Sequence, residues 1–296
     1  MHPDQDCRAI PGAEREYQMT ETMADDRRAA TPSPADLSMM PPAELRRAAR
    51  AGRFTAATTT ASRGYVQANL AILPRDYAEE FLLFCQRNPR ACPLIGLSDP
   101  GSPRLPDLGA DIDLRSDLPS YRVFRDGAFV EDRPDVGELW RDDFVAFALG
   151  CSLSFEEALG SAGVAQSYLD HDRIVPTYLT NIECRPAGRF SGNLVVSMRQ
   201  FSPRDAIRAI QVTTRFPNVH GAPVHIGDPA LIGIADLAEP YFGTPPDIAL
   251  GQLPLFWACG VTPQLALAVA RPPVAITHTP AHMLVTDRRN ADFAVL

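Results

Sequence analysis

Short apolar segments that end at proline or glycine recur along this 296-residue chain, and they restrict it to folds built from short strands and helices. GYVQANLAILP, residues 64–74, reads as an extended segment that Pro74 stops. RDYAEEFLLFCQRN, residues 75–88, instead spaces its apolar side chains for one helix face and ends before Asn88-Pro89. Another helix is expected over residues 42–51, closed by Gly52 in the left-handed conformation. This alternation of strand and helix predicts the α/β class.

The middle of the chain has a different pattern of predicted strands, turns and helices. YRVF and AFV flank Arg125-Asp126-Gly127, which predicts a β-hairpin built on an Asp-Gly turn. Residues 142–149 are predicted to be helical, and Ser154-Phe155-Glu156-Glu157 has the form of a capping box that opens a helix. LVVSMR, residues 194–199, predicts a strand, and a helix is expected over residues 203–214. Strands in front of amphipathic helices favour a two-layer α/β unit here.

Composition limits the partners and the location. The formal net charge of −8, without a basic stripe, argues against nucleic acid and anionic membranes as partners. No stretch approaches the roughly 20 apolar residues of a membrane helix. Six dispersed cysteines without a Cys-x-x-Cys pair indicate the reduced cytoplasm. Homo-oligomer formation is left open. Residues 1–36 mix charged residues, Ala, Pro and Thr without periodicity, which predicts a disordered arm.

Four of the six histidines lie in two short segments near the C-terminus. His220 and His225 occur in HGAPVHIGDP, and His278 and His282 occur in THTPAHM. Imidazole changes charge near neutral pH, so histidines that converge are suited to proton transfer. Asp228 is placed to orient one of them. We therefore expect the two segments to meet in one cleft, although loop histidines bonded to the backbone are the alternative.

No familiar cofactor or metal motif accompanies these histidines. The spacings His-x4-His and His-x3-His across prolines differ from those of zinc helices. A divalent metal is chemically allowed but not favoured, and no cofactor is expected. Cys184 and Cys259 lie in expected loops, where each could be a nucleophile or a small buried hydrophobe. Gly150-Cys151-Ser152 lacks the second glycine of a nucleophile elbow, which disfavours Ser152 as a nucleophile.

Eight blocks between about residues 37 and 287 together resemble one known family. They are GYVQANLAILP, FLLFCQRNPRACPLI, SDLPSYRVFRDG, GCSLSFEEAL, NLVVSMR, RFPNVHGAPVHIGDP, LPLFWACGVTPQ and ITHTPAHMLVTD. This order resembles the hydro-lyase family related to D-glutamate cyclase, which converts D-glutamate to 5-oxo-D-proline and water. The resemblance implies a three-layer α/β domain with the active site, residues 37–105 plus 219–296, and an inserted two-layer α/β domain, residues 106–218.

Three positions depart from the family pattern. Leu179 replaces a basic residue and Glu183 replaces a proline, on either side of Asn181 in a segment that we expect to be a loop at the cleft. Losing a cation and gaining a carboxylate favours a cationic substrate group, such as an amine or a guanidine. Ala281 stands where the family pattern has glycine, which restricts the loop between His278 and His282.

The resemblance leads to a hypothesis of cyclodehydration of a small polar substrate, in which an amine or guanidine nitrogen attacks a carbonyl of the same molecule and water leaves. A histidine of the first segment would be the base and one of the second the acid. Asp228 and Glu183 would hold the cationic end of the substrate. Arg199 or Asn181 would stabilise the oxygen that gains charge, with Cys184 and Cys259 as further candidate site residues.

Two alternatives remain open at this point. One keeps the acidic substrate D-glutamate, whose carboxylates Arg185, Arg189 and Arg199 would hold. The other is a protein that binds a small molecule without turning it over.

Overall fold

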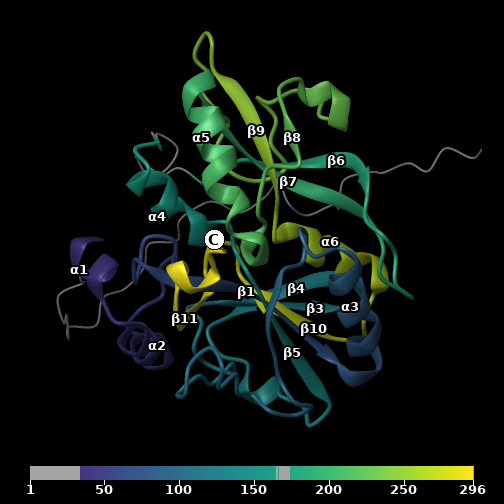
Figure 1. The fold of residues 1–296 in the computed structure, drawn as a ribbon. Coiled ribbons are helices and arrows are strands. Elements are labelled where there is room, and N and C mark those ends of the chain that lie inside the picture. Colours follow the sequence, from purple (N-terminus) through teal and green to yellow (C-terminus); the bar gives the residue numbers. More distant parts are fainter. Residues whose placement is uncertain (1–33, 165, 167–173, 296) are drawn as a thin grey trace, which may run out of the picture. The chain divides into compact units, whose positions relative to one another are not determined.

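Strand β1 (Tyr65–Pro74) is central to the first of two sheets in the computed structural model, which describes residues 34–164, 166 and 174–295 (Figure 1). The strand order is β2-β5-β1-β10-β3-β4, and β11 also pairs with β1. All of these pairings are antiparallel. The other strands are β2 (Leu94–Leu97), β3 (Tyr121–Arg125), β4 (Ala128–Arg133), β5 (Phe144–Leu149), β10 (Ala275–His278) and β11 (Leu284–Arg289).

The second sheet has the order β6-β7-β9-β8, again antiparallel throughout. Its strands are β6 (Thr177–Glu183), β7 (Asn193–Phe201), β8 (His225–Ile226) and β9 (Leu253–Ala258). Ser197 pairs with Thr177 on one side and with Trp257 on the other. Directly opposed residues share a face of an antiparallel sheet, so one face carries Ser197 and Arg199 beside Trp257 and Leu255.

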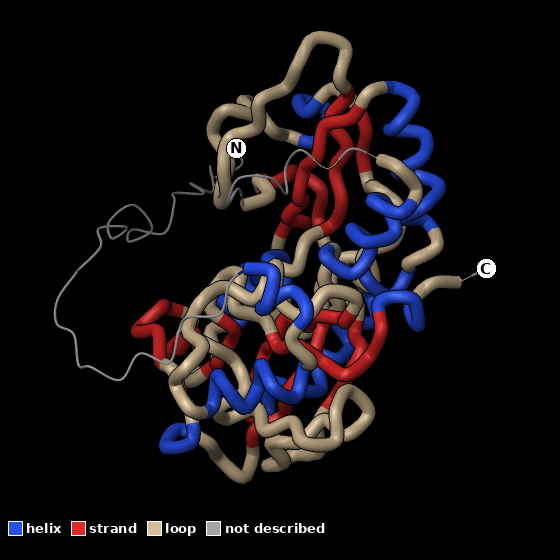
Figure 2. Tube along the Cα trace, turned by 90° about the vertical axis from the view of Figure 1, so that its left-hand side faces the viewer, coloured by secondary structure: helices blue, strands red, loops and turns tan. Residues whose placement is uncertain are grey.

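Helices lie around and between the sheets (Figure 2). Helix α3 packs against β1 and β5, α4 against β1 and α5, and α6 against β7. The α-helices are α1 (Pro34–Met39), α2 (Pro42–Arg50), α3 (Arg75–Arg87), α4 (Leu153–Ser161), α5 (Pro203–Thr214) and α6 (Val261–Ala270). Short 3-10 helices are η1 (Gly137–Leu139), η3 (Pro217–Val219), η4 (Pro229–Ile232) and η5 (Asn290–Phe293).

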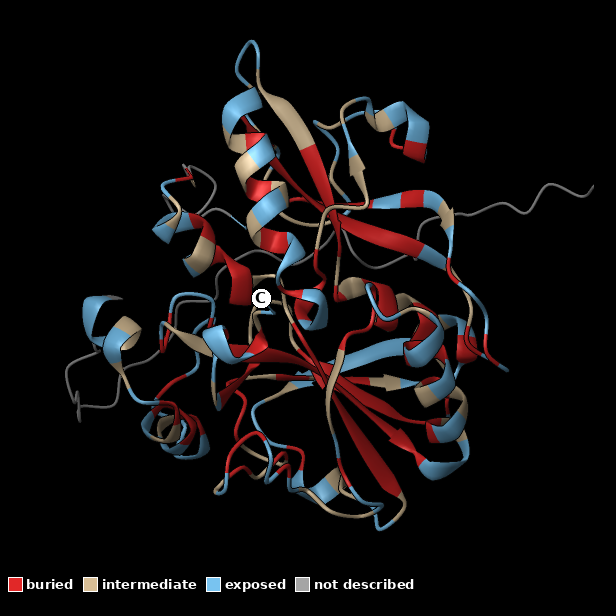
Figure 3. Cartoon of the chain, in the orientation of Figure 1, coloured by how far each residue is buried: buried red, intermediate tan, exposed pale blue. Residues whose placement is uncertain are grey.

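The two sheets share their hydrophobic cores. One cluster of buried side chains joins Phe147 of the first sheet with Val196 and Phe256 of the second. Another joins Val66 of β1 to Trp257 of β9. The buried central strands are visible in Figure 3. A third cluster covers the first sheet with apolar side chains from an irregular segment, residues 105–118. These shared cores fix the ends of strands from both sheets relative to one another.

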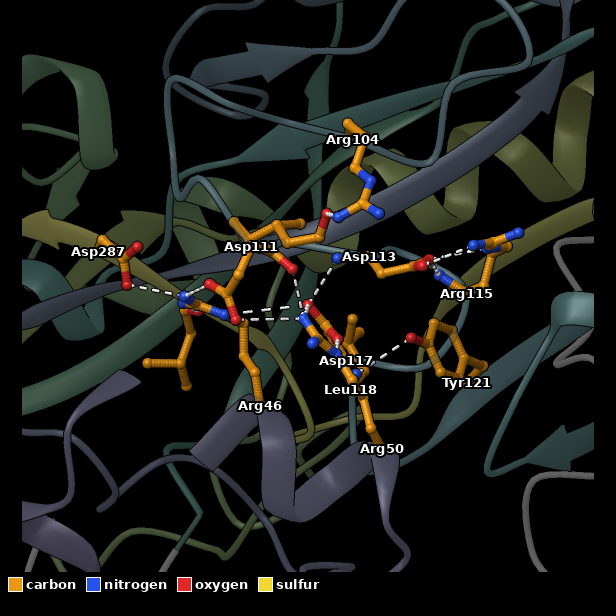
Figure 4. Close-up of polar contacts among 12 residues, drawn as sticks. Arg46, Arg50, Arg104, Asp111, Asp113, Arg115, Asp117, Leu118, Tyr121 and Asp287 are labelled. Atoms are coloured by element: carbon orange, nitrogen blue, oxygen red, sulfur yellow. Dashed lines mark hydrogen bonds and ion pairs between the residues drawn. The ribbon is translucent and has the colours of Figure 1, made fainter. Parts of the chain in front are cut away.

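A buried arginine attaches α2 to this framework (Figure 4). Arg46 is 1% exposed and donates to the carbonyl oxygen of Val285, at 2.8 Å, and to the carboxylates of Asp111 and Asp287. Asp117, whose side chain is fully buried, accepts hydrogen bonds from Arg50 of the same helix. Burial raises the pKa of Asp117, and the guanidinium groups of Arg50 and Arg46 act in the opposite direction.

Most predicted elements are confirmed, including the strand at 65–74, the helix at 75–87 and the hairpin at Asp126-Gly127, whose φ angles are 48° and 81°. Three predictions are wrong, one of which is the loop expected around Asn181, where the chain forms strand β6. Residues 144–149 form the buried strand β5 rather than a helix. The predicted capping box at Ser154 is also wrong, because the N-cap of α4 is Ser152, two residues earlier, and its side chain makes no capping hydrogen bond.

The predicted α/β class is confirmed, whereas the layers and the domain boundaries stay predictions. The strands between residues 106 and 218 are divided between the sheets, with β3, β4 and β5 in the first and β6 and β7 in the second. The predicted arm, residues 1–36, falls outside the described residues except for its last three, which belong to α1.

Candidate active site

Two strands, one from each sheet, end in a cysteine-bearing loop that leads directly into a helix. β5 continues through Gly150, Cys151 and Ser152 into α4, and β9 continues through Cys259 and Gly260 into α6. Neither helix has a side-chain cap at its first turn. The first N–H groups of a helix carry partial positive charge, so both ends are suited to bind a carboxylate or a developing oxyanion.

Arg199 of β7 holds polar side chains around the first of these ends. Its guanidinium donates to the hydroxyl oxygens of Ser152, at 2.9 Å, and Ser197, at 3.0 Å. Its Nε donates to Glu156 of α4 at 2.8 Å, and the side chain is fully buried between Phe155 and Trp257. Because Arg199 occupies an acceptor site of each serine, both hydroxyl protons can be donated elsewhere.

Asn69 of β1 connects the two cysteine loops. Its Nδ2 donates to the carbonyl oxygen of Gly150 at 3.0 Å. A Cβ atom at residue 260 would lie only 2.5 Å from that same nitrogen. The amide of Asn69 is therefore packed between Gly150, before α4, and Gly260, before α6.

Both loop thiols are protonated near neutral pH. Burial raises the pKa of Cys259 to about 11, although the N–H groups of Val261 and Gly260 act in the opposite direction. Burial likewise raises the pKa of Cys151 despite the nearby N–H of Leu153 and the charge of Arg199. A thiolate is the nucleophilic form of cysteine, so these groups are better placed as hydrogen-bond and proton donors than as nucleophiles.

Comparisons with known proteins identify the family. The family model for D-glutamate cyclase matches residues 145–287, a span that contains both cysteine loops. A protein of Xanthobacter autotrophicus, provisionally named a hydro-lyase, is 55% identical over 86% of this chain and 92% of its own length. Provisionally named hydro-lyases of Aliivibrio salmonicida and Bordetella pertussis are 56% and 58% identical over 85% and 83% of this chain, and over 97% and 89% of their own lengths. The chain belongs to the D-glutamate cyclase family of hydro-lyases.

The predicted enzyme class, a carbon–oxygen lyase, is confirmed by these relatives. Among solved structures, a nitrogen repressor-like protein of Methanococcus jannaschii aligns with 79% of this chain and 90% of its own at 12% identity and a TM-score of 0.35, which is too low to inform the fold or the function. Within the described ranges, no group of three or more His, Cys, Asp or Glu side chains could hold a metal ion. No helix in this part of the chain is long and apolar enough to cross a membrane.

In this member of the D-glutamate cyclase family, His220 lies beside the first cysteine loop. Its Nδ1 is 2.7 Å from the carbonyl oxygen of Arg90, and the side chain is 1% exposed. Burial lowers the pKa of His220 to about 4, partly offset by the carbonyl oxygens of Arg90 and Gly150, so the imidazole is neutral. Its backbone has the strained φ of 82°. These contacts indicate that His220 positions the loop before α4.

His225 lies in β8 of the second sheet, and Asp228 lies between β8 and η4. The ring of His225 packs against Phe256, with centroids 5.7 Å apart, and its Nε2 is 2.8 Å from the carbonyl oxygen of Asp228. The Asp228 carboxylate caps η4 by accepting from the N–H of Ala230. The pair is therefore held by local backbone contacts.

His278 is the last residue of β10 in the first sheet, and His282 lies in the loop between β10 and β11. Nδ1 of His278 accepts from the backbone N–H of Leu70 at 3.2 Å, and burial lowers the pKa of His278 to about 4. Nδ1 of His282 is 2.8 Å from the carbonyl oxygen of Pro280. No hydrogen bond or ion pair among the described residues joins either histidine to His220 or His225. The expected meeting of the two histidine segments in one cleft thus gains no support, and their acid–base roles stay predictions.

Of the other predicted residues, Cys184 is buried in the shared core, and burial raises its pKa to about 11. Asn181 and Glu183 are exposed on β6, a strand where we expected a loop. Cys259 and Arg199 do lie at the candidate site, but Arg199 reaches it through the serines. The structure does not bring Cys184, Asn181 and Glu183 into contact with these residues.

Sequence reasoning missed Asn69, Cys151, Glu156 and Ser197 and set Ser152 aside. Asn69 and Ser197 are polar residues inside apolar strand segments, ANLAIL and LVVSMR. A polar side chain in a buried strand needs a partner, and that requirement was the available signal.

Proposed function

We propose that this protein catalyses an intramolecular cyclodehydration at the N-terminal ends of α4 and α6. The observation that carries the proposal is what gathers at these ends: the partial positive charge of two helix N-termini without side-chain caps, the Ser152 hydroxyl oriented by Arg199, and the protonated Cys259. Donors of this kind stabilise the oxyanion that forms when a nitrogen attacks a carbonyl carbon.

An amino acid with a second carboxylate, as in D-glutamate, suits this site best. When the amine attacks the distant carboxylate, the new C–N bond forms and one C–O bond breaks. Two protons of the ammonium group and the departing oxygen make up the water, so no net proton is taken up or released. The enzyme's contributions are then to hold the chain curled, to stabilise the oxyanion and to relay protons, for which Cys259 is available.

A substrate with a cationic end is the second candidate for this site. Leu179 of β6 pairs with Val195 of β7 and lies on the sheet face that also carries Ser197 and Arg199. The side chain of Leu179 is 47% exposed. An exposed apolar side chain at this position would pack against the methylene groups of an amine or guanidine substrate. Glu183, further along the same strand, would pair with the cationic group.

The test is turnover of a substrate panel by the purified full-length protein. D-glutamate and an amino or guanidino aldehyde are incubated with it, and cyclised products are identified by mass spectrometry. Ser152→Ala should lower kcat by about 10²-fold, the usual effect of losing one oxyanion donor. Ser161→Ala, at the opposite, exposed end of α4, should leave kcat unchanged. Absence of turnover across the panel, or full activity of Ser152→Ala, would contradict the proposal.

A further inference from the structure

Asn69 is an amide in a strand that is otherwise almost entirely apolar. It pairs with Leu149, the last residue of β5, and its neighbours Ala68 and Leu70 are buried. The residue is 7% exposed. Burying an amide at this position is unfavourable unless its polar atoms find partners. One partner is present, because Nδ2 donates to the carbonyl oxygen of Gly150 at 3.0 Å.

Gly260 provides the room for this amide. The backbone of Gly260 has a φ of −64° and a ψ of −2°, which any residue can adopt. A Cβ atom there would lie 2.5 Å from Nδ2, 2.7 Å from Cγ and 2.9 Å from Oδ1 of Asn69. Glycine is thus needed for the close approach of the Asn69 side chain and not for its own conformation, and the amide lies against the N-terminal end of α6.

The carbonyl oxygen of this amide has no hydrogen-bond partner among the described residues. Oδ1 of Asn69 makes no hydrogen bond with the residues that the structure describes, and it is not among their fully buried atoms that lack a partner, so solvent reaches it. The surrounding helix ends and hydroxyls are donors, whereas Oδ1 can only accept. A ligand that places acceptor oxygens at the helix ends still needs an N–H group at Oδ1.

We propose that Asn69 binds the nucleophilic nitrogen of the substrate, with Oδ1 accepting a hydrogen bond from the amine. This inference rests on the proposed function and adds the residue that orients the attacking group. Anchoring of Nδ2 on Gly150 fixes the orientation of the amide. A hydrogen bond to one N–H of the amine then directs the nitrogen lone pair toward the carbonyl carbon held at the helix ends.

The experiment compares two ligands that differ only in the amine. Thermal shift titrations measure the binding of D-glutamate and of glutarate, which lacks the amino group, to the full-length protein. The wild type should prefer D-glutamate. Asn69→Ala and the milder Asn69→Ser should reduce that preference about tenfold, the value of one good hydrogen bond, and leave glutarate binding unchanged. Asn88→Ala, which removes an amide at the end of α3, is the matched control and should keep the preference.

Kinetics separate this inference from the proposed function. Turnover by the wild type together with an unchanged ligand preference in both Asn69 variants would overturn the role of Asn69 alone. Absence of turnover would overturn the proposed function, yet a preference for D-glutamate that depends on Asn69 would still support an amine-binding residue. A wild type that binds both ligands equally, or neither, would overturn the inference.

Discussion

Ala281 has a strained backbone conformation. Its φ of 68° lies in the left-handed region, where the methyl group of an L-residue crowds the backbone. Its carbonyl oxygen accepts from the backbone N–H and the hydroxyl of Thr58, which holds the loop in this conformation. The sequence comparison with the family pattern anticipated glycine at this position, and the observed φ gives the physical reason.

Ala281→Gly should therefore stabilise the protein. Relief of the left-handed strain outweighs the greater flexibility of glycine in the unfolded chain, for a net gain of about 0.5–1 kcal/mol in the free energy of unfolding. Urea denaturation measures this change. Ala51→Gly is the control, because Ala51 has a φ of −87° and should gain nothing. Equal or lower stability of Ala281→Gly would contradict the strain argument.

At the scale of elements, local sequence was sufficient wherever pattern and environment agreed. Helix α3 and the β3–β4 hairpin follow from spacing and from the Asp-Gly turn. Strand β5, FVAFAL, contains good helix formers and no alternation. It is a strand because it pairs with β1 and β2 along its edges and has both faces buried, one in each of two core clusters. That environment is created by residues distant in sequence, so a local pattern could not reveal it.

The sequence predicted some residues of the candidate site but not how the fold brings them together. Cys259 and Arg199 were recognised as chemical groups, whereas the role of Asn69 depends on two glycines that are 81 and 191 positions further along the chain. Of the predicted histidines, His220 lies beside the loop before α4, whereas His225 and His282 have nearby backbone carbonyl oxygens as their partners. Type and local spacing of titratable residues do not report which of them the fold brings together.

Helix α2 allows a test of an element's attachment. Arg46→Met should lower the free energy of unfolding by about 2–3 kcal/mol, because it leaves the buried carbonyl oxygen of Val285 without its donor and removes one of the two guanidinium groups beside the buried carboxylate of Asp117. Arg47→Met removes the same charge from an exposed position of the same helix and should change stability by no more than about 0.5 kcal/mol. Chemical denaturation of both variants gives the comparison, and equal losses would rule out a special role for the buried network.

At the scale of the whole molecule, the two sheets form one structure through their shared cores. Residues from β1, β5, β7 and β9 pack in common clusters, so the loops that end these strands are fixed relative to one another. Two neutral histidines lie within this interior, His220 beside the loop before α4 and His278 beside β1. Protonation of either would place a charge among buried groups, which links the stability of the assembled sheets to pH.

The sign of that linkage follows from the pKa values. Each histidine has a pKa of about 4 in the folded protein, whereas an unfolded histidine titrates near 6.5. Between these values the unfolded chain binds protons that the folded protein does not, so stability is retained above about pH 6.5 and falls as the pH drops toward 4. From pH 7 to pH 5 the loss should be roughly 2 kcal/mol for each histidine.

The double variant His220→Asn with His278→Asn should show a flatter dependence of unfolding free energy on pH over this range. Asparagine tolerates the left-handed backbone of residue 220 and can supply an oxygen to the N–H of Leu70. The variant will be less stable than the wild type at pH 7. The difference in unfolding free energy should narrow at pH 5, because only the wild type loses stability through these two histidines, whereas the carboxylates contribute equally to both proteins. His225→Asn controls for the loss of a partly exposed imidazole. Stability curves that run parallel from pH 7 to pH 5 would show that the buried histidines are not the source of the acid sensitivity.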